Sequence, residues 1–287
     1  MSPPRPTLLL SVDFEDWHQL IRRRVGASNW QQPGPALARE TEAVLDLFDR
    51  LNARATFFVL GMAARSHPQL VKRIVNRGHE IGCHGDAHLP VHTQTPREFG
   101  ADLRAARATI EELTGTMPVG YRAPAFSITR AADWAYDVLA QEGFAYDSSQ
   151  HDSPAIRDRA VPTGRAPHRL QTGLWEFPIA VWRARSARIP VGGASYWQLL
   201  PTRLLLRGLD NAGPLAGLYL HPYELDPQPL RAMLPAEATA AQQAHAKLRE
   251  TQRNGARRRA RGALEAIAQR FALIPYGEAH ARFGDGA

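Results

Sequence analysis

The chain has a single cysteine, Cys83, among its 287 residues. An intrachain disulfide is therefore excluded, and a chain of this length can instead rely on a large core. Long hydrophobic runs are also missing, because the run Leu8–Leu10 near the start is soon followed by Asp13. Such a run is too short for the core of a signal peptide and far below the roughly 20 residues of a membrane span. We therefore expect a soluble, cytoplasmic protein.

Lysine is scarce as well, since Lys72 and Lys247 are the only two, and the net charge of +7 comes almost entirely from arginine. A late cluster comprises Arg249, Arg253, Arg257, Arg258, Arg259 and Arg261. It is either a solvated helix face or a surface for an anionic membrane or a lipid-linked glycan, which would place the protein at the periphery of the inner membrane. No nucleic-acid partner is expected, because no known binding motif accompanies the cluster.

Strand-like and helix-like segments alternate along the first half of the chain. We predict strands over 7–13, 55–60, 80–83, 119–122 and 144–146, separated by helices over about 35–51, 67–78, 95–115 and 129–142. This alternation favours parallel βαβ units. The second half is less regular, and there we predict strands over 175–179, 218–221 and 271–274, a substrate-facing loop at 192–193, and a helix over 236–270 that is broken near Gly255.

Four of the predicted strands carry a polar residue at or just beyond their carboxyl ends. They end at Asp13, Cys83, Arg122 and His221, and His84 directly follows Cys83. Parallel barrels place their active sites at this end of the strands. We therefore expect these side chains to lie near one another.

The segment SVDFED holds three acids within four residues. Strand alternation sends Asp13 and Glu15 to one face and Phe14 to the other, and Asp16 lies just beyond and can turn in as well. Carboxylates this close repel one another unless a cation or an arginine lies opposite. The simpler alternative is a solvated loop.

Histidines are spaced four residues apart in EIGCHGDAH. A single helical turn would aim the rings of His84 and His88 at one point. Two imidazoles and a carboxylate can hold one divalent ion and leave positions open for water. The spacing therefore indicates a metal site, although such a pair is only moderately specific.

Arg122 and His221 complete the set of candidate residues. Arg122 precedes Ala123–Pro124, which favours a rigid, extended chain, so that it can pair with an acid and fix its orientation. A surface salt bridge is the alternative for this arginine. His221 lies at a strand end beside Pro222 and can donate a proton to a leaving group, although a lone histidine is usually structural.

The ordered series SVDFED, RGHEIGCHGDAH, GYRAPAF and LYLHP resembles the polysaccharide deacetylase superfamily, carbohydrate esterase family four, from about Leu8 to Glu224. The segments DFEDWHQ, GYRAPAFSI, YDSS, LWEFPI, GGASYWQLLP and HPYELDP are similar to the members found with bacterial exopolysaccharide and exosortase loci. The resemblance implies one α/β domain over 1–287, a distorted (β/α) barrel of the polysaccharide deacetylase type. The catalytic motifs then lie within 8–224, and a C-terminal helical extension over about 236–270 packs on the barrel.

The resemblance also implies roles for these residues. Asp13 becomes the general base, Arg122 orients it, and His221 becomes the general acid. His84 and His88 become ligands of one divalent metal ion, with zinc the expected metal.

The acidic ligand is where this chain departs from the family pattern. The common motif has the metal-binding Asp directly after the base, but Phe14 stands there. The ligand must shift to Glu15 or Asp16, and alternation favours Glu15 while Asp16 stays open.

The implied reaction removes N-acetyl groups from amino sugars of a bacterial polysaccharide or of its lipid-linked precursor, so that an N-acetylated glycan is the expected partner. A backbone amide near Gly120–Tyr121 would help the metal to stabilise the oxyanion. One alternative is hydrolysis of another C–N bond, in a cyclic imide or ureide, and another is a non-catalytic glycan-binding module. Candidates for the walls of the pocket are Trp17, Tyr121, Phe126, Trp175 and Tyr223.

Overall fold

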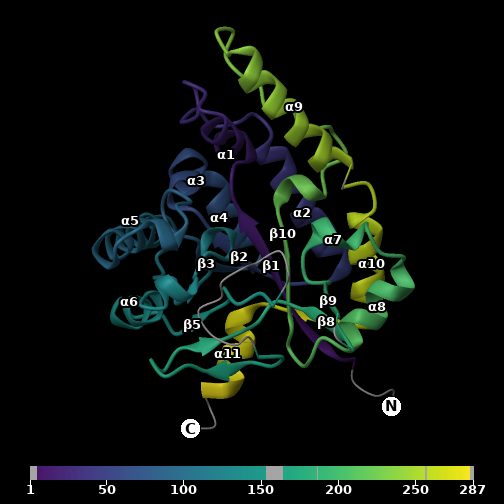
Figure 1. Cartoon of the computed structure of the whole chain (residues 1–287). Coiled ribbons are helices and arrows are strands. Elements are labelled where there is room, and N and C mark those ends of the chain that lie inside the picture. Colours follow the sequence, from purple (N-terminus) through teal and green to yellow (C-terminus); the bar gives the residue numbers. More distant parts are fainter. Residues whose placement is uncertain (1–4, 153–163, 186, 256, 285–287) are drawn as a thin grey trace.

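The computed structural model describes residues 5–152, 164–185, 187–255 and 257–284 (Figure 1). Within them, one curled sheet has nine strands, of which one pairs antiparallel and the others parallel. The strands are β1 (Thr7–Phe14), β2 (Thr56–Val59), β3 (Glu80–Cys83), β4 (Gly120–Tyr121), β5 (Tyr146–Asp147), β6 (His168–Arg169), β7 (Trp175–Glu176), β10 (Gly217–Leu220) and β11 (Ala272–Ile274). Their order is β10-β1-β2-β3-β4-β5-β7-β6, and β11 pairs with the start of β1. A separate hairpin consists of β8 (Val181–Ala184) and β9 (Ala187–Pro190).

Helices surround the sheet on its outer side. They are α1 (Trp17–Arg24), α2 (Leu37–Leu51), α3 (Gly61–Ser66), α4 (Pro68–Asn76), α5 (Pro96–Thr114), α6 (Ala135–Gln141), α7 (Ala194–Trp197), α8 (Thr202–Asp210), α9 (Ala240–Gly255), α10 (Ala260–Arg270) and α11 (Tyr276–Gly284). Figure 1 shows α5 and α6 on one flank and α8 and α10 on the other, with α1 and α9 beyond the carboxyl end of β1.

The chain after β7 closes the sheet onto β10, which makes the distorted barrel that the sequence predicted. Ile179 pairs with Gly217 in parallel, and Ala180 N donates to Gly217 O at 2.9 Å. The interior is filled by a cluster of large side chains, Leu9, Phe58, Tyr146, Phe177 and Tyr276. Because this interior is a packed core, only the strand ends are open to a ligand.

Strand β1 divides its side chains between two environments. Leu10, Val12 and Phe14 join the large core cluster outside the barrel, where the apolar faces of α2, α4, α8 and α10 also pack. Leu9 and Asp13 lie on the other face, with Leu9 in the barrel interior. The predicted alternation around Asp13 is therefore confirmed.

Most of the predicted elements are present. Helix α5 begins with a capping box, with Thr95 as the N-cap and Glu98 at its third position. The helix predicted over 129–142 is shorter, because a 3₁₀ turn over Arg130–Ala132 precedes α6. The break predicted near Gly255 separates α9 from α10. Helices α1, α3, α7, α8 and α11, strand β6 and the β8–β9 hairpin were not predicted.

The Gly192–Gly193 segment is buried against β10, which differs from the predicted substrate-facing loop. Gly193 pairs with Tyr219 in parallel, and a Cβ on Gly193 would lie 2.5 Å from the ring of Tyr219. The two glycines thus allow close backbone approach to a strand, which a side chain would prevent.

The late arginines are divided between buried and exposed positions, so Arg257 is not part of any basic surface. Arg257 is 8% exposed, and its Nη1 donates to Tyr223 O at 2.8 Å. Arg258, Arg259 and Arg261 are exposed, and Arg261 pairs with Glu265 at 3.6 Å. Of the helices in the described part of the chain, none is long and apolar enough to cross a membrane.

Glu40 in α2 makes stability depend on pH. This carboxyl is 1% exposed, and burial, followed by the nearby Asp226 and Asp16, raises its pKa from 4.5 to about 8. The folded state therefore holds a proton that the unfolded chain releases, so this group lowers stability progressively as pH rises from about 4.5 to about 8. In thermal unfolding, we expect the Tm of Glu40→Gln to fall less than that of the wild type between about pH 6 and pH 9. The exposed Glu112→Gln is the control, and equal losses in wild type and Glu40→Gln would contradict the assignment.

Candidate active site

The predicted site residues meet at the carboxyl edge of the sheet. Asp13 and Glu15 come from the end of β1, His84 follows β3, Arg122 follows β4, and His221 follows β10. The parallel order β10-β1-β2-β3-β4 brings these ends to one edge. Their gathering follows from the topology, as expected from the sequence.

Arg122 binds Asp13 at the centre of this edge. Its Nη1 donates to Asp13 Oδ1 at 2.8 Å and to Ser11 Oγ at 2.6 Å, and its Nη2 donates to Tyr276 Oη at 2.9 Å. The guanidinium is fully buried, and the ring centroid of Phe58 lies 4.2 Å from its Cζ. Because several oxygen acceptors and the ring of Phe58 hold this guanidinium in place, it fixes the orientation of Asp13.

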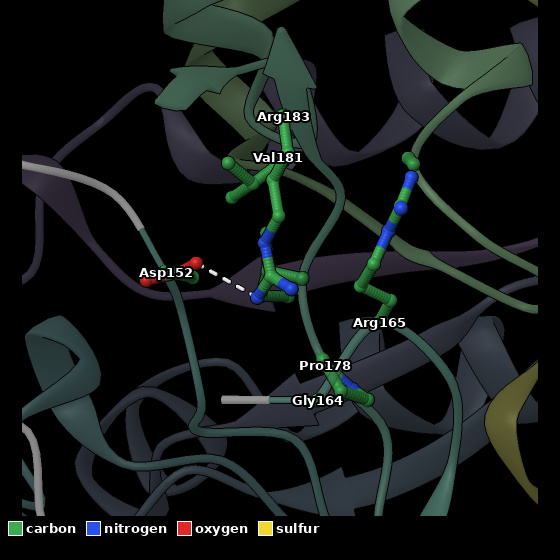
Figure 2. Close-up of a pocket in the computed structure, with 8 residues that line it drawn as sticks. Asp152, Gly164, Arg165, Pro178, Val181 and Arg183 are labelled. Carbon is green, nitrogen blue, oxygen red and sulfur yellow. Dashed lines mark ion pairs between the residues drawn. The ribbon is translucent and has the colours of Figure 1, made fainter. Parts of the chain in front are cut away.

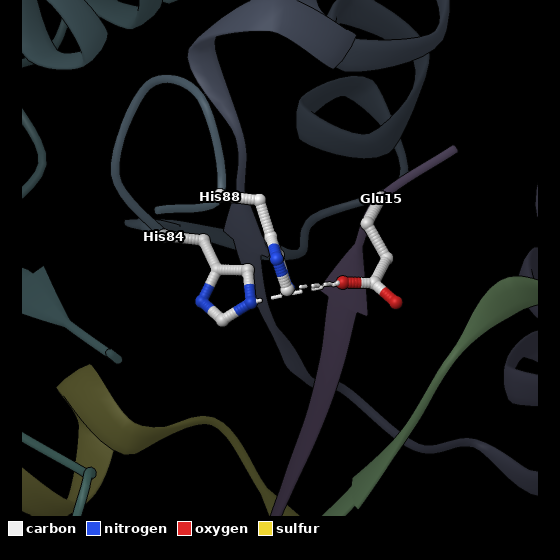
Figure 3. Close-up of side chains that lie close together, drawn as sticks. All are labelled: Glu15, His84 and His88. Atoms are coloured by element: carbon white, nitrogen blue, oxygen red, sulfur yellow. Dashed lines mark ion pairs between the residues drawn. The ribbon is translucent and has the colours of Figure 1, made fainter. Parts of the chain in front are cut away.

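Glu15, His84 and His88 form a compact donor group (Figure 3). One carboxylate oxygen and one nitrogen from each ring lie within 4.8 Å of one another. Glu15 Oε2 is 3.0 Å from His88 Nε2 and 4.0 Å from His84 Nε2. The Nδ1 of His84 contacts Arg122 O at 2.8 Å. Because a carbonyl only accepts, Nδ1 carries the proton and the lone pair of Nε2 faces Glu15, so these residues fit a divalent ion.

The two histidines are brought together by an irregular loop, not by the helical turn predicted from their spacing. The chain turns at Gly85, which has a φ of +78°, and His88 has a φ of +54°. Such a φ is unfavourable for a residue with a side chain, so the surrounding contacts must hold it. Asp102 in α5 accepts from Asp86 N at 2.7 Å on the inner side of this loop.

Arg23 in α1 holds the loop from the other side, donating to Ala87 O at 2.5 Å and to His88 O at 3.0 Å. Because these contacts restrain the strained His88 backbone, we expect Arg23→Gln to weaken metal binding, by roughly 10- to 100-fold as for other residues that orient metal ligands. Calorimetric titration with zinc measures this. Arg22→Gln is the control, since Arg22 binds Gln32 O and Ala232 O instead. Unchanged affinity in Arg23→Gln would show that the loop needs no such restraint.

Asp16 lies outside the donor group. Its Oδ1 accepts from His18 N at 2.8 Å and its Oδ2 from Gly34 N at 2.5 Å, which makes it the N-cap of α1 and an anchor for the loop before α2. The helix therefore starts directly after Asp16 and turns its carboxylate away from the histidines. Of the two acids left open by the sequence, Glu15 is the one that faces them.

Electrostatics distinguish the titratable groups of the site. Burial alone would raise the pKa of Glu15, but His221, His88 and His84 together lower it to about 2. Burial lowers the pKa of His84 to about 4, against a smaller opposing effect of Asp13. Burial would also lower the pKa of His221, but Glu15 and Glu224 raise it to about 9. At neutral pH, Glu15 is therefore ionised, His84 neutral and His221 protonated.

Glu224 and Ser195 were missed by the sequence reasoning. Glu224 Oε2 lies 3.1 Å from His221 Nδ1 and accepts from His221 N at 2.9 Å, so that His221 Nε2 points to Glu15 Oε1 at 3.5 Å. Ser195 Oγ donates to the other oxygen of Glu224 at 2.5 Å, and Arg253 Nη1 lies 3.2 Å from the same Oγ. The spacing of His and Glu in HPYE, three residues apart in a short turn, is the signal that could have found Glu224.

The site opens on the side of His88 and His221, whose side chains are 20% and 14% exposed. Tyr223 stacks on His221 with ring centroids 5.0 Å apart. Phe126 is close to Tyr219, and it has the left-handed φ of +54°. Of the other aromatic candidates, Trp17 packs with Tyr223, Tyr121 with Phe99 and Phe144, and Trp175 with Phe283.

The backbone amide near Gly120–Tyr121 stays a prediction as the oxyanion donor. Gly120 and Tyr121 form the interior strand β4, which pairs with β3 and β5. Tyr121 O accepts from Ser148 N at 2.9 Å as part of this ladder. The backbone of this segment is therefore paired with the neighbouring strands of the sheet.

A second, small cavity lies apart from the donor group (Figure 2). Asp152, Arg165, Pro178, Val181 and Arg183 are among its lining residues. Arg183 Nη2 pairs with Asp152 Oδ2 at 2.7 Å across it. It contains none of the site residues predicted from the sequence.

Comparison with known proteins agrees with this arrangement. Residues 33–144 match the polysaccharide deacetylase family model, and residues 148–275 match a domain of unknown function, DUF3473. A peptidoglycan deacetylase of Helicobacter pylori is 32% identical over 106 residues, 37% of this chain and 35% of that one. A chitooligosaccharide deacetylase of a Bradyrhizobium species is 34% identical over 123 residues, 42% of this chain and 53% of that one. The chain thus matches about a third to about half of the length of these relatives.

A solved structure shows the same fold over nearly the whole length. The crystal structure of an assigned polysaccharide deacetylase from Mycobacterium smegmatis has a TM-score of 0.56, with 22% identity and 95% of each chain covered. The family match within 33–144 includes His84, His88 and Arg122, while His221 lies in the second matched region. Residues 33–144 therefore match the polysaccharide deacetylase family, and the chain shares the fold of this solved structure.

Proposed function

We propose that the protein hydrolyses N-acetyl groups from amino sugars of a bacterial polysaccharide, with one divalent metal ion as cofactor. The observation that carries this proposal is the placement of a carboxylate–arginine pair, a Glu–His–His donor group and a protonated histidine at one edge of the sheet. The match of residues 33–144 to the polysaccharide deacetylase family supports the same reaction class.

Asp13 is the proposed general base. Arg122 holds one of its oxygens at 2.8 Å, which leaves the other free to accept a proton from water. Because Arg122 is buried and bonded to several partners, it holds this carboxylate in a fixed orientation for the proton transfer.

His221 is the proposed general acid. Its Nδ1 is engaged by Glu224, so Nε2 is the nitrogen that faces the donor group and the opening of the site. Because the raised pKa of about 9 keeps the ring protonated, Nε2 can give its proton to the departing amine.

Glu15, His84 and His88 are the proposed metal ligands, and three protein ligands of this kind are typical of catalytic zinc. When bound, the ion supplies polarisation of the acetyl carbonyl and of the attacking water. In the overall reaction, water adds to the carbonyl carbon, Asp13 takes a proton from it, the C–N bond breaks, and His221 protonates the nitrogen. The products are acetate and a free amino sugar.

Acetate release from a panel of N-acetylated oligosaccharides tests the proposal. We expect release by the purified protein, loss of release after chelation, and recovery on addition of zinc. A cyclic imide and a ureide belong in the same panel. Ring opening of these compounds without any acetate release would replace the proposed reaction, and binding of glycans without turnover would indicate a binding module.

Glu224 should act by positioning His221. We expect Glu224→Gln to lower kcat more than it changes KM, because the amide keeps the shape of the side chain but removes the charge that stabilises protonated His221. Steady-state kinetics on one oligosaccharide measure the split, and retained zinc affinity by calorimetry excludes damage to the ligands. Glu237→Gln, at an exposed glutamate bonded to Ser28, is the control. A change confined to KM would contradict this role.

A further inference from the structure

Helices α1 and α9 face each other across two matching stripes of residues. In α1, Trp17, Ile21 and Arg24 lie at helical spacing on one side, and Trp17 and Ile21 share an apolar cluster with Ala246 of α9. In α9, Ala246 is the only buried residue described, and it lies on one stripe with Arg249 and Arg253, three and seven residues further on. Along each helix, the residues on this face are therefore apolar first and arginine further towards the carboxyl end.

Contacts at both ends fix how α9 lies along α1. Gln242 Nε2 donates to Gly26 O at 2.9 Å, just after the end of α1. At the other end, Arg253 reaches Ser195 Oγ at 3.2 Å, and its Cζ lies 5.9 Å from the ring centroid of Tyr223. The two helices thus run antiparallel, and Arg249 lies between these anchors.

The three arginines lie close together without an acidic partner of their own. Arg24 is exposed, and Arg249 and Arg253 are half-buried. Burial, followed by the charges of Arg249 and Arg253, lowers the pKa of Arg24, whereas Tyr223 and then Glu224 raise the pKa of Arg253 against its burial. Within the described residues, none of the three forms an ion pair with a carboxylate, and Arg249 donates only to the neutral Gln252.

This cluster borders the opening of the site. Helix α1 begins two residues after Glu15, and Figure 1 shows α1 and α9 beyond the carboxyl end of β1. Arg253 is connected to the proposed acid through Ser195 and Glu224, and Tyr223 lies between its guanidinium and the ring of His221. A glycan with its acetamide at His221 and Glu15 would extend past the surface where α1 and α9 meet.

We propose that Arg24, Arg249 and Arg253 bind an anionic substituent, a carboxylate or a phosphate, on a sugar near the N-acetyl group that is removed. This inference rests on the proposed deacetylation and narrows its substrate class to acidic glycans. Guanidiniums that form no ion pair, placed where two helices meet, can bind such anions, because each presents several donors to carboxylate or phosphate oxygens. The neighbouring anion would also offset the repulsion that Arg24 experiences from Arg249 and Arg253.

The test compares three N-acetylglucosamine oligosaccharides: a neutral one, one that alternates with glucuronate, and one that carries a phosphate. We expect the wild type to prefer a charged substrate over the neutral one by roughly tenfold in kcat/KM at low salt, and less at high salt. In the double variant Arg24→Gln/Arg249→Gln, the ratio of kcat/KM for the charged substrate to kcat/KM for the neutral one should fall towards one. The control variant Arg258→Gln/Arg261→Gln should keep the wild-type ratio. The carboxylate and phosphate arms identify which group is recognised.

Binding measurements separate this inference from the proposed function. In a His84→Ala background, which removes a proposed metal ligand, calorimetry should still show tighter binding of a charged oligosaccharide and its loss in the double arginine variant. A ratio that the double variant leaves unchanged would overturn the proposal. So would binding to vesicles that contain anionic lipid, lost in the double variant, with no preference for any charged oligosaccharide.

Discussion

Replacement of His84 or His88 by Ala is expected to abolish stoichiometric zinc binding and to reduce acetate release to background. Each change removes one of three donor groups that lie within 4.8 Å of one another, and too few protein ligands then remain to hold the ion. Metal content by atomic absorption and acetate release by a coupled assay measure the two losses. Circular dichroism should show that both variants remain folded.

The controls for this experiment come from the same segments of the chain. His92→Ala should keep metal and activity, because His92 Nδ1 contacts Ser127 O outside the donor group. Glu15→Gln should weaken zinc binding more than Asp16→Asn does, since Asn also caps a helix and keeps the start of α1. If Asp16→Asn alone strips the metal, Glu15 is not the acidic ligand. Full metal occupancy in both histidine variants would remove this site from consideration.

Asp13→Asn is expected to lower kcat by roughly 10²- to 10⁴-fold, the contribution typical of a general base, while zinc remains bound. The amide keeps the shape of the side chain and its place beside Arg122, but it cannot take a proton from water. Single-turnover rates and zinc titration of the same preparation measure the two properties. Asp137→Asn, at an exposed position in α6, is the control.

Two outcomes would contradict this role for Asp13. A rate within a few fold of the wild type would mean that another group accepts the proton. Loss of zinc together with activity would make Asp13 a ligand. Stability is a further check, because Asn beside the buried Arg122 leaves an uncompensated cation, which costs about 3–5 kcal/mol in pairs of this kind.

Local sequence patterns were sufficient to predict several parts of the fold. The continuous apolar run of β1 predicts a strand that is buried on both faces, and alternation predicts that Asp13 and Phe14 separate. The capping box of Thr95 and Glu98 defines the start of α5 through contacts only three residues apart. These predictions hold because the forces behind them act between near neighbours in the chain.

Other elements gave too weak a signal for prediction. Strand β6 is only two residues long, which is shorter than any periodic pattern. Helix α1 carries three arginines in its last turn and little apolar character, although Asp16 at its N-cap was a usable start signal. Its existence decides which acid faces the histidines, so this omission left the ligand open.

The sequence by itself determined the α/β class, the carboxyl edge as the place of the site, and Asp13, His84, His88, Arg122 and His221 as its members, because strand ends and motif order are local properties. Only the tertiary structure shows that Glu15 faces the two histidines and that Asp16 does not, since the position of Asp16 depends on Gly34 N, 18 residues away. The same holds for Arg23 and the loop carbonyls 64 and 65 residues away, and for Arg253 and Ser195, 58 residues apart. Contacts over such separations form only when the barrel closes, and no local pattern carries them.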